Sequence, residues 1–128
     1  MTPILSVDNV TRNFGGLAAV AHASLHLEPG ELVGLIGPNG AGKTTMFNLL
    51  TGVYPPSSGD IRFARDGQEI SLVGKRPYAI CRAGVGRTFQ NIRLFKDLTV
   101  LDNVVIAMQQ RHRYTLLSGF LHAAGYAA

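Results

Sequence analysis

Apolar and polar residues alternate along two early stretches of the chain, residues 4–10 and 19–27. Alternation with a period of two predicts strands that bury one face. A third stretch, residues 32–36, is continuously apolar. That pattern predicts a strand buried on both faces, as in a parallel sheet. The first third of the chain is therefore expected to be mainly β-structure.

The middle of the chain carries the pattern of a hairpin followed by a short helix. Residues 60–63 and 69–73 read as strands, and Asp66-Gly67 between them is a strong signal for a tight β-hairpin turn. Pro77 suits the first turn of a helix, which we expect to end near Gly84.

The last predicted elements are a strand over residues 85–89 and a helix over residues 100–111. Thr99 precedes this helix and Asp102 follows three residues later, which resembles a capping arrangement. Beyond residue 114 the pattern is weak and predicts no element.

The length of the chain allows one domain, and its composition argues against a membrane-spanning or secreted protein. It has 128 residues, and charged residues make up 16%, against about 25% in a typical soluble domain, so part of the surface is expected to meet a partner. No apolar run is long enough to span a bilayer, and no cationic start indicates a secretory signal. The single cysteine fits a reducing compartment.

The formal net charge is +4, and the positive charge lies in residues 70–128, whereas residues 1–69 are net negative. Nucleic acid, an acidic partner surface, lipid headgroups and a plain solvated face all remain open from charge alone. The basic residues are scattered along the sequence, so charge does not choose among them.

One motif carries chemistry. Eight consecutive residues match the pattern G-x-x-x-x-G-K-[ST], and a chain of this composition would contain such a match by chance in about 0.4% of cases. They are Gly37, Pro38, Asn39, Gly40, Ala41, Gly42, Lys43 and Thr44. A predicted strand precedes the motif, and residues 43–50 after it are predicted to be a helix that stops at Gly52.

The residue types and spacing of the motif predict a phosphate-binding loop, here called the phosphate cradle. Glycines allow consecutive backbone N–H groups to converge on an anion at a helix N-terminus. Lys43 would supply a point charge to the β- and γ-phosphates, Thr44 would present its hydroxyl to Mg²⁺, and Thr45 would reach toward the α-phosphate. We therefore expect the chain to bind a nucleoside triphosphate with Mg²⁺.

Together with a second segment, the motif resembles the ATP-binding cassette (ABC) ATPases. Residues 37–45 look like their Walker A loop, and residues 84–104, which read GVGRTFQNIRLFKDLTVLDNV, resemble their Q-loop and the start of their helical subdomain. The sequence of these segments is similar to that of the ATPase subunits of branched-chain amino-acid importers. The similarity covers about residues 4–112. GTPases share the first motif but not the second.

The resemblance implies a role for several further residues. Gln90 would be the Q-loop glutamine, which contacts Mg²⁺ and the attacking water and is the catalytic candidate here. Phe14 would stack on the adenine ring of ATP. Residues 91–98, with Arg93, Phe95 and Lys96 exposed, would receive the transmembrane permease subunits. A second ATPase subunit would join head to tail.

The expected fold is an α/β P-loop NTPase core of the ABC type, with an antiparallel β subdomain and the start of a helical subdomain. Residues 1–112 would form this partial nucleotide-binding domain, and residues 113–128 an uncertain tail. The resemblance implies a peripheral position on the cytoplasmic face of a bacterial plasma membrane. It also calls for a signature motif, a Walker B carboxylate segment and a switch histidine, none of which occurs in the sequence.

Two further interpretations accompany the importer hypothesis. Because the catalytic carboxylate segment is missing, we expect a truncated form that binds ATP but hydrolyses little of it alone. The alternative is a nucleotide-binding fragment or regulator with no transport role. Nucleic-acid binding through the basic half is a third interpretation. The resemblance argues against it, because it implies that the chain has no nucleic-acid partner.

Overall fold

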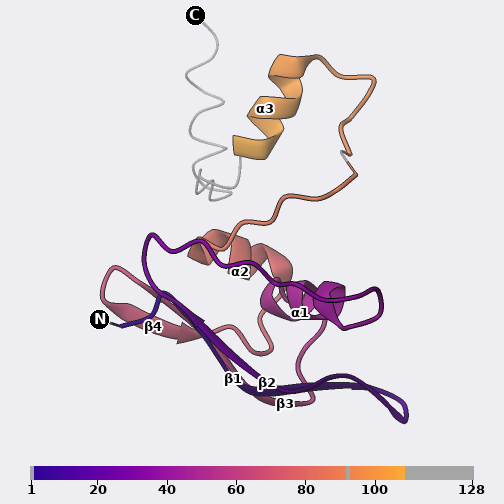
Figure 1. Ribbon diagram of the computed structural model, residues 1–128. Helices are drawn as coiled ribbons and strands as arrows, with labels where there is room; N and C mark the ends of the chain where they lie inside the picture. Colours follow the sequence, from indigo (N-terminus) through magenta and orange to yellow (C-terminus); the bar gives the residue numbers. More distant parts are fainter. Residues whose placement is uncertain (1, 92, 109–128) are drawn as a thin grey trace, which may run out of the picture. The chain divides into compact units, whose positions relative to one another are not determined.

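The computed structural model describes residues 2–91 and 93–108 (Figure 1). The chain divides into two units, Met1–Thr88 and Phe89–Ala128. The first unit contains all the described strands and two helices, and the second contains one helix. The domain boundary expected at residue 112 lies outside the described residues.

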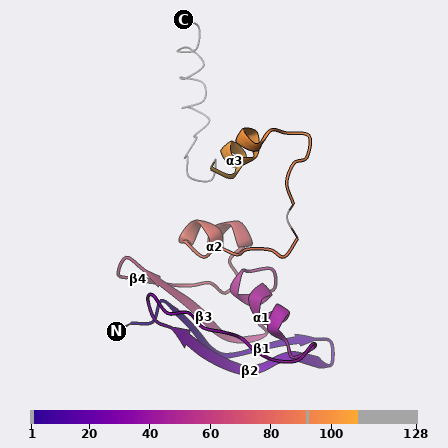
Figure 2. The same ribbon diagram turned by 45° about the horizontal axis from the view of Figure 1, so that its top comes forward.

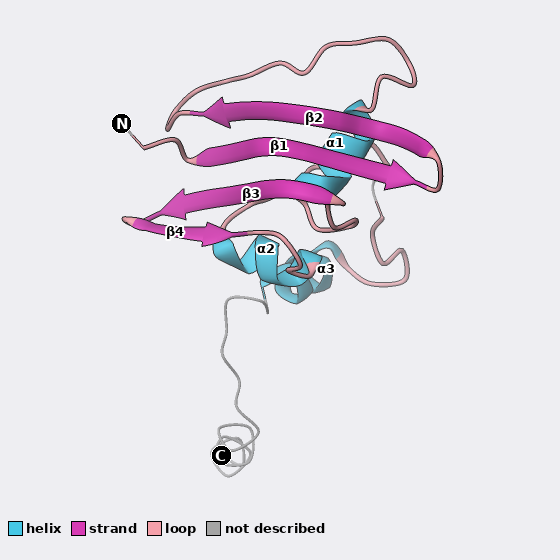
Figure 3. Ribbon diagram, turned by 90° about the horizontal axis from the view of Figure 1, so that it is seen from below, coloured by secondary structure: helices cyan, strands magenta, loops and turns pink. Residues whose placement is uncertain are grey.

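An antiparallel sheet of four strands forms the base of the first unit (Figure 3). Its order is β2-β1-β3-β4, so the two long N-terminal strands lie beside the later hairpin. The strands are β1 Leu5–Phe14, β2 Leu17–Leu27, β3 Ser58–Arg65 and β4 Gln68–Ser71. The two predicted alternating segments and the two predicted hairpin segments are confirmed as strands; β1, β2 and β3 are longer than predicted, and β4 ends before residue 73.

The hairpin between β3 and β4 turns at Asp66 and Gly67, as the sequence predicts. Both residues have positive φ angles, 53° and 77°. A two-residue turn of this hand matches the right-handed twist of paired strands. Arg65 accordingly pairs with Gln68 directly across the turn.

Two helices, α1 Lys43–Leu50 and α2 Pro77–Ala83, cover one face of the sheet (Figure 2). The bounds of α1 are those predicted, with Thr51 and Gly52 closing its end. Proline opens α2 at its first position, where its missing N–H costs no hydrogen bond, and Gly84 follows the last turn.

The third helix, α3 Val100–Met108, lies in the second unit and opens with the predicted capping arrangement. The Asp102 N–H donates to Thr99 Oγ1 at 3.1 Å, and the Thr99 N–H donates back to Asp102 Oδ2 at 3.3 Å. These reciprocal bonds satisfy backbone donors that a helix start leaves without partners. Residues 109–111 of the predicted helix lie outside the described residues.

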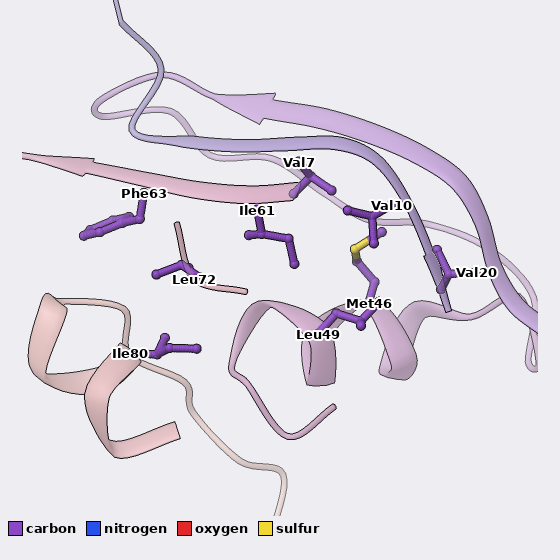
Figure 4. Close-up of a cluster of buried hydrophobic side chains, with 9 residues drawn as sticks. All are labelled: Val7, Val10, Val20, Met46, Leu49, Ile61, Phe63, Leu72 and Ile80. Carbon is purple, nitrogen blue, oxygen red and sulfur yellow. The ribbon is translucent and has the colours of Figure 1, made fainter. Parts of the chain in front are cut away.

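A hydrophobic core fills the space between the sheet and the two helices (Figure 4). Every element of the first unit contributes to it except β4, whose neighbour Leu72 does so instead. The buried side chains are Val7, Val10, Val20, Met46, Leu49, Ile61, Phe63, Leu72 and Ile80. Because α1 is held by this core at Met46 and Leu49, the loop that precedes α1 is anchored at one end.

Charged side chains form a network that begins on β3 at Arg62, between the buried Ile61 and Phe63. The Arg62 guanidinium donates to Asp8 on β1 and to Glu69 on β4, and it lies 3.5 Å from Asp60 Oδ2. The hydrogen bond to Asp8 makes the largest contribution to raising the pKa of Arg62 above its ordinary value. The network links the three strands across the sheet.

The prediction of a strand over residues 32–36 is wrong. Residues 31–38 contain no strand, and Leu32 and Ile36 are 99% and 94% exposed. An apolar run becomes a buried strand only where neighbouring strands accept its backbone hydrogen bonds. The sheet in the described part of the chain is antiparallel, and neither residues 32–36 nor the predicted strand at 85–89 belong to it.

Within the described residues, no helix is both long and apolar enough to cross a bilayer.

Replacing Leu49 by alanine tests the position of the core. Leu49 is 2% exposed, so Leu49→Ala should lower the free energy of unfolding by about 2–5 kcal/mol. Leu32→Ala is the matched control, because Leu32 is 99% exposed and its truncation should change that energy by no more than about 0.5 kcal/mol. Urea unfolding followed by circular dichroism measures both. A large loss at Leu32 would show that residues 32–36 are packed after all.

Candidate phosphate-binding site

The loop before α1 is a tight turn that leads directly into the helix. The Ala41 N–H donates to the Pro38 carbonyl at 3.2 Å, and the Gly42 carbonyl accepts the Met46 N–H at 2.9 Å to begin the helix. Among the described residues no side chain caps α1. The first-turn N–H groups of α1 are therefore not satisfied by a capping side chain, which suits an anion at this end.

Gly42 brings the loop against β2. Its φ angle is 90°, and a Cβ placed there would lie 2.4 Å from the Ala19 carbonyl oxygen. Only glycine combines this backbone conformation with so close an approach. Gly42, the glycine directly before Lys43, thus fixes the loop on the sheet.

Lys43, the first residue of α1, turns its side chain back over the loop. Its ammonium donates to the Gly37 carbonyl and, at 2.8 Å, to the Pro38 carbonyl. An ammonium has three donors, so one remains for another acceptor. The loop therefore encloses a positive charge whose position is set by its own backbone.

A cleft of about 310 Å³ opens beside this charge. It brings together six of the predicted site residues with the start of β2. The lining residues are Leu17, Ala18, Ala19, Asn39, Gly40, Gly42, Lys43, Thr44 and Thr45. Gly37, Pro38 and Ala41 belong to the same loop but do not line the cleft. The contribution of residues 17–19 is not evident from the motif.

The donor set of the cleft fits Mg²⁺ held together with a nucleotide. Thr44 is exposed and is one of the residues that line the cleft. The described residues contain no group of three or more His, Cys, Asp or Glu side chains suited to a metal. Mg²⁺ at phosphates needs few protein ligands, because phosphate oxygens and waters complete its shell. A single hydroxyl beside a phosphate cradle is compatible with that chemistry.

Phe14 lies at the end of β1 and is 39% exposed, outside the hydrophobic core. Its Cα partner in the sheet is Leu17, which lines the cleft. Its ring meets Tyr54 edge to face, with 5.2 Å between centroids, and the Arg12 guanidinium lies 4.7 Å from its centroid. Neither Arg12 nor Tyr54 stands out in the sequence. Only the spacing of two between Arg12 and Phe14, which puts them on one face of a strand, hints at the contact.

Gln90 belongs to the second unit, whereas Lys43 and the cleft belong to the first. Gln90 is exposed, and its catalytic and metal-binding roles stay predictions.

The predicted partner segment, residues 91–98, also lies in the second unit, and residue 92 is outside the described residues. Asn103 of α3 fastens this segment, because its side chain accepts from the Phe95 N–H at 3.0 Å and donates to the Phe95 carbonyl at 3.1 Å. As predicted, Arg93, Phe95 and Lys96 are exposed. An apolar groove of about 490 Å³ lies between the segment and α3. It is lined by Leu94, Phe95, Lys96, Leu98, Val100, Asn103, Val104 and Ala107.

Comparisons with known proteins agree on one family. A family profile described as "ABC transporter" matches residues 20–125. The high-affinity branched-chain amino acid transport ATP-binding protein LivG of Escherichia coli K12 is 48% identical over 124 residues, which are 97% of this chain and 47% of LivG. Its counterpart BraF of Pseudomonas aeruginosa is 46% identical with the same coverage. The chain thus spans about half the length of these relatives.

Solved structures give the same result for the fold. The ADP conformation of MJ1267, an ATP-binding cassette of an ABC transporter, matches with a TM-score of 0.73 and 29% identity, over 95% of this chain and 46% of that one. The dimeric structure of MJ0796, a bacterial ABC transporter cassette, matches with a TM-score of 0.68 and 26% identity, over 88% and 50% of the two chains.

Two glycines of the loop allow a matched test of its contact with β2. Gly40→Ala and Gly42→Ala both place a Cβ at positive φ, which costs about 1–2 kcal/mol. Only Gly42→Ala also meets the Ala19 carbonyl, whereas the space at Gly40 is open. Gly42→Ala should therefore lower the free energy of unfolding by clearly more than Gly40→Ala in urea titrations. Equal losses would mean that the loop does not rest on β2.

Proposed function

The chain belongs to the ABC transporter family, and from that membership we propose that it is the ATP-binding part of an importer for branched-chain amino acids. The expected family and fold class, an ABC ATPase core with an antiparallel β subdomain, are confirmed by the family match and the structural neighbours. Identity of 48% to LivG supports the importer class and its substrates.

The observation that carries the proposal is the placement of Lys43. Its ammonium lies at the glycine loop, beside a cleft lined by the start of α1. A triphosphate in this cleft would meet a fixed cation together with the uncapped N–H groups of the helix start. The ammonium would exchange part of its contact with the Gly37 and Pro38 carbonyls for phosphate oxygens, which accept hydrogen bonds from a cation more strongly.

The other predicted site residues would contact different parts of the nucleotide. Bound Mg²⁺ would neutralise charge on the phosphates, with the Thr44 hydroxyl as its ligand from this chain. Thr45, half-buried beside it, would hold the α-phosphate side. Phe14, partly exposed and paired with Leu17 at the cleft, would stack on the adenine ring.

For hydrolysis, phosphoryl transfer to water needs a group that positions the water. The side chains that line the cleft in the described part include a lysine and two threonines but no carboxylate. We therefore propose that this chain binds ATP and hydrolyses little of it alone. Gln90 would contribute to the attacking water in the assembled transporter.

The second unit would connect the nucleotide to the membrane partner. Its groove between residues 94–98 and α3 is lined mainly by apolar residues, together with Lys96 and Asn103. Such a groove suits an amphipathic helix of a transmembrane permease subunit. The protein would then lie peripherally on the cytoplasmic face of the membrane, and a second ATPase subunit would complete the head-to-tail dimer.

Lys43→Ala tests the nucleotide site. Loss of a charged hydrogen-bond donor costs about 1.5–3 kcal/mol, so the affinity for Mg·ATP should fall about 10- to 100-fold in isothermal titration calorimetry. Lys75→Ala is the matched control, since Lys75 is exposed and does not line the cleft, and it should bind like the unsubstituted chain. Unchanged affinity of the folded Lys43→Ala variant would remove the phosphate-cradle assignment.

Leu94→Asp tests the proposed permease surface. Leu94 is 64% exposed and lines the groove, so a charge there should greatly reduce capture of purified branched-chain amino-acid permease subunits in detergent. Leu101→Asp is the control, because Leu101 is 70% exposed in α3 but does not line the groove. Equal loss of capture by both variants would count against the groove.

A further inference from the structure

Arg12 has no role in any of the motifs, yet its side chain lies against the aromatic residue proposed to hold the nucleotide base. We propose that Arg12, together with Tyr54, is a positioning residue that fixes the ring of Phe14 for stacking on the base. The inference rests on the proposed function and adds two residues that determine how well the base is held.

Two side chains of β1, Arg12 and Phe14, meet the distant Tyr54 at the end of that strand. The Arg12 guanidinium carbon lies 4.7 Å from the Phe14 centroid and 5.4 Å from the Tyr54 centroid. The two rings are 5.2 Å apart at 80°, which is the favoured edge-to-face arrangement. A guanidinium at these distances is attracted by the electron-rich ring faces.

The guanidinium is itself held in place. Its Nη1 donates to the Pro55 carbonyl at 2.9 Å, and its Nε is buried without a hydrogen-bond partner among the described residues. A buried N–H without a partner is unfavourable, so the contacts with the two rings and with Pro55 must outweigh that cost. Arg12 is therefore fixed between β1 and the segment that follows α1.

Two hydrogen bonds from backbone N–H groups fasten the same two segments beside the cluster. The Ser57 N–H donates to the Thr11 carbonyl at 2.8 Å, and the Asn13 N–H donates to Ser57 Oγ at 3.1 Å. These bonds hold Tyr54 and Pro55 near the end of β1. Arg12 and Tyr54 consequently have defined positions from which to contact Phe14.

Phe14 needs such support because of its place in the fold. It is the last residue of β1, next to the Gly15 turn, and lies outside the hydrophobic core. A ring ordered only when the base arrives loses conformational freedom at that moment, and this weakens binding. A ring already held by Arg12 and Tyr54 avoids most of that loss. Arg12 thus acts on the base and not on the phosphates, which bind at Lys43.

The test compares a ligand that has a base with one that lacks it. Calorimetry with Mg·ATP and with Mg·tripolyphosphate is carried out on the unsubstituted chain, Arg12→Met and Arg12→Lys. Arg12→Met keeps an apolar stem but removes the charge. It should weaken ATP about three- to tenfold and leave tripolyphosphate within about twofold, whereas Arg12→Lys keeps a cation over the rings and should recover most of the ATP affinity.

A double-mutant cycle with Phe14→Ala shows whether Arg12 acts through the ring. In the Phe14→Ala background, Arg12→Met should no longer weaken ATP. Unchanged or tighter ATP binding by Arg12→Met would overturn the proposal, as would an equal loss for ATP and tripolyphosphate. Should the unsubstituted chain bind tripolyphosphate but not ATP, the positioning role fails and the phosphate site stands. Binding of neither ligand would overturn both.

Discussion

The account depends on how the Lys43 ammonium is held by the loop that precedes its own helix. A lysine side chain is long and flexible, and in water its charge would occupy many positions. Here the Gly37 and Pro38 carbonyls accept hydrogen bonds from it, while the Gly42 carbonyl starts the helix to which Lys43 belongs. The cation is thus placed at the helix N-terminus before any ligand arrives, where the helix dipole also favours a negative charge.

The rest of the first unit serves to hold that loop in place. Met46 and Leu49 anchor α1 in the core, and Gly42 rests against β2 at Ala19. The same antiparallel sheet carries Phe14 at the end of β1 and the cleft-lining residues at the start of β2. The fold thereby joins the proposed phosphate cradle to an aromatic side chain through two adjacent strands. The second unit, with Gln90 and its apolar groove, supplies the surface proposed for a partner.

Much of this arrangement could be predicted from the sequence, because local interactions decide it. The bounds of α1 follow from the glycine motif and Gly52, the β3–β4 hairpin from Asp66-Gly67, and the start of α3 from the pairing of Thr99 with Asp102. Each of these signals acts within a few residues. The position of the glycine loop before α1 could be predicted for the same reason, since the loop is one short segment.

Features that depend on distant neighbours could not be predicted. The apolar run at residues 32–36 reads as a buried strand, but a strand forms only beside partners, and the described sheet offers it none. Tyr54 lies far from Arg12 and Phe14 in the sequence, and no periodic pattern predicts its contact with them. The role proposed for Gln90 comes from its sequence motif alone. Gln90 and Lys43 belong to different units, so the structure gives no distance between Gln90 and the cleft.

The most direct measurement of the central claim is an NMR titration of the ¹⁵N-labelled chain with Mg·tripolyphosphate. The ligand carries no base, so it reports on the phosphate cradle alone. The account predicts that the largest amide shifts fall on residues 39–45, where backbone N–H groups and Lys43 meet the cleft. Amides of this loop that stay unchanged at saturating ligand, or shifts centred elsewhere in the chain, would contradict it.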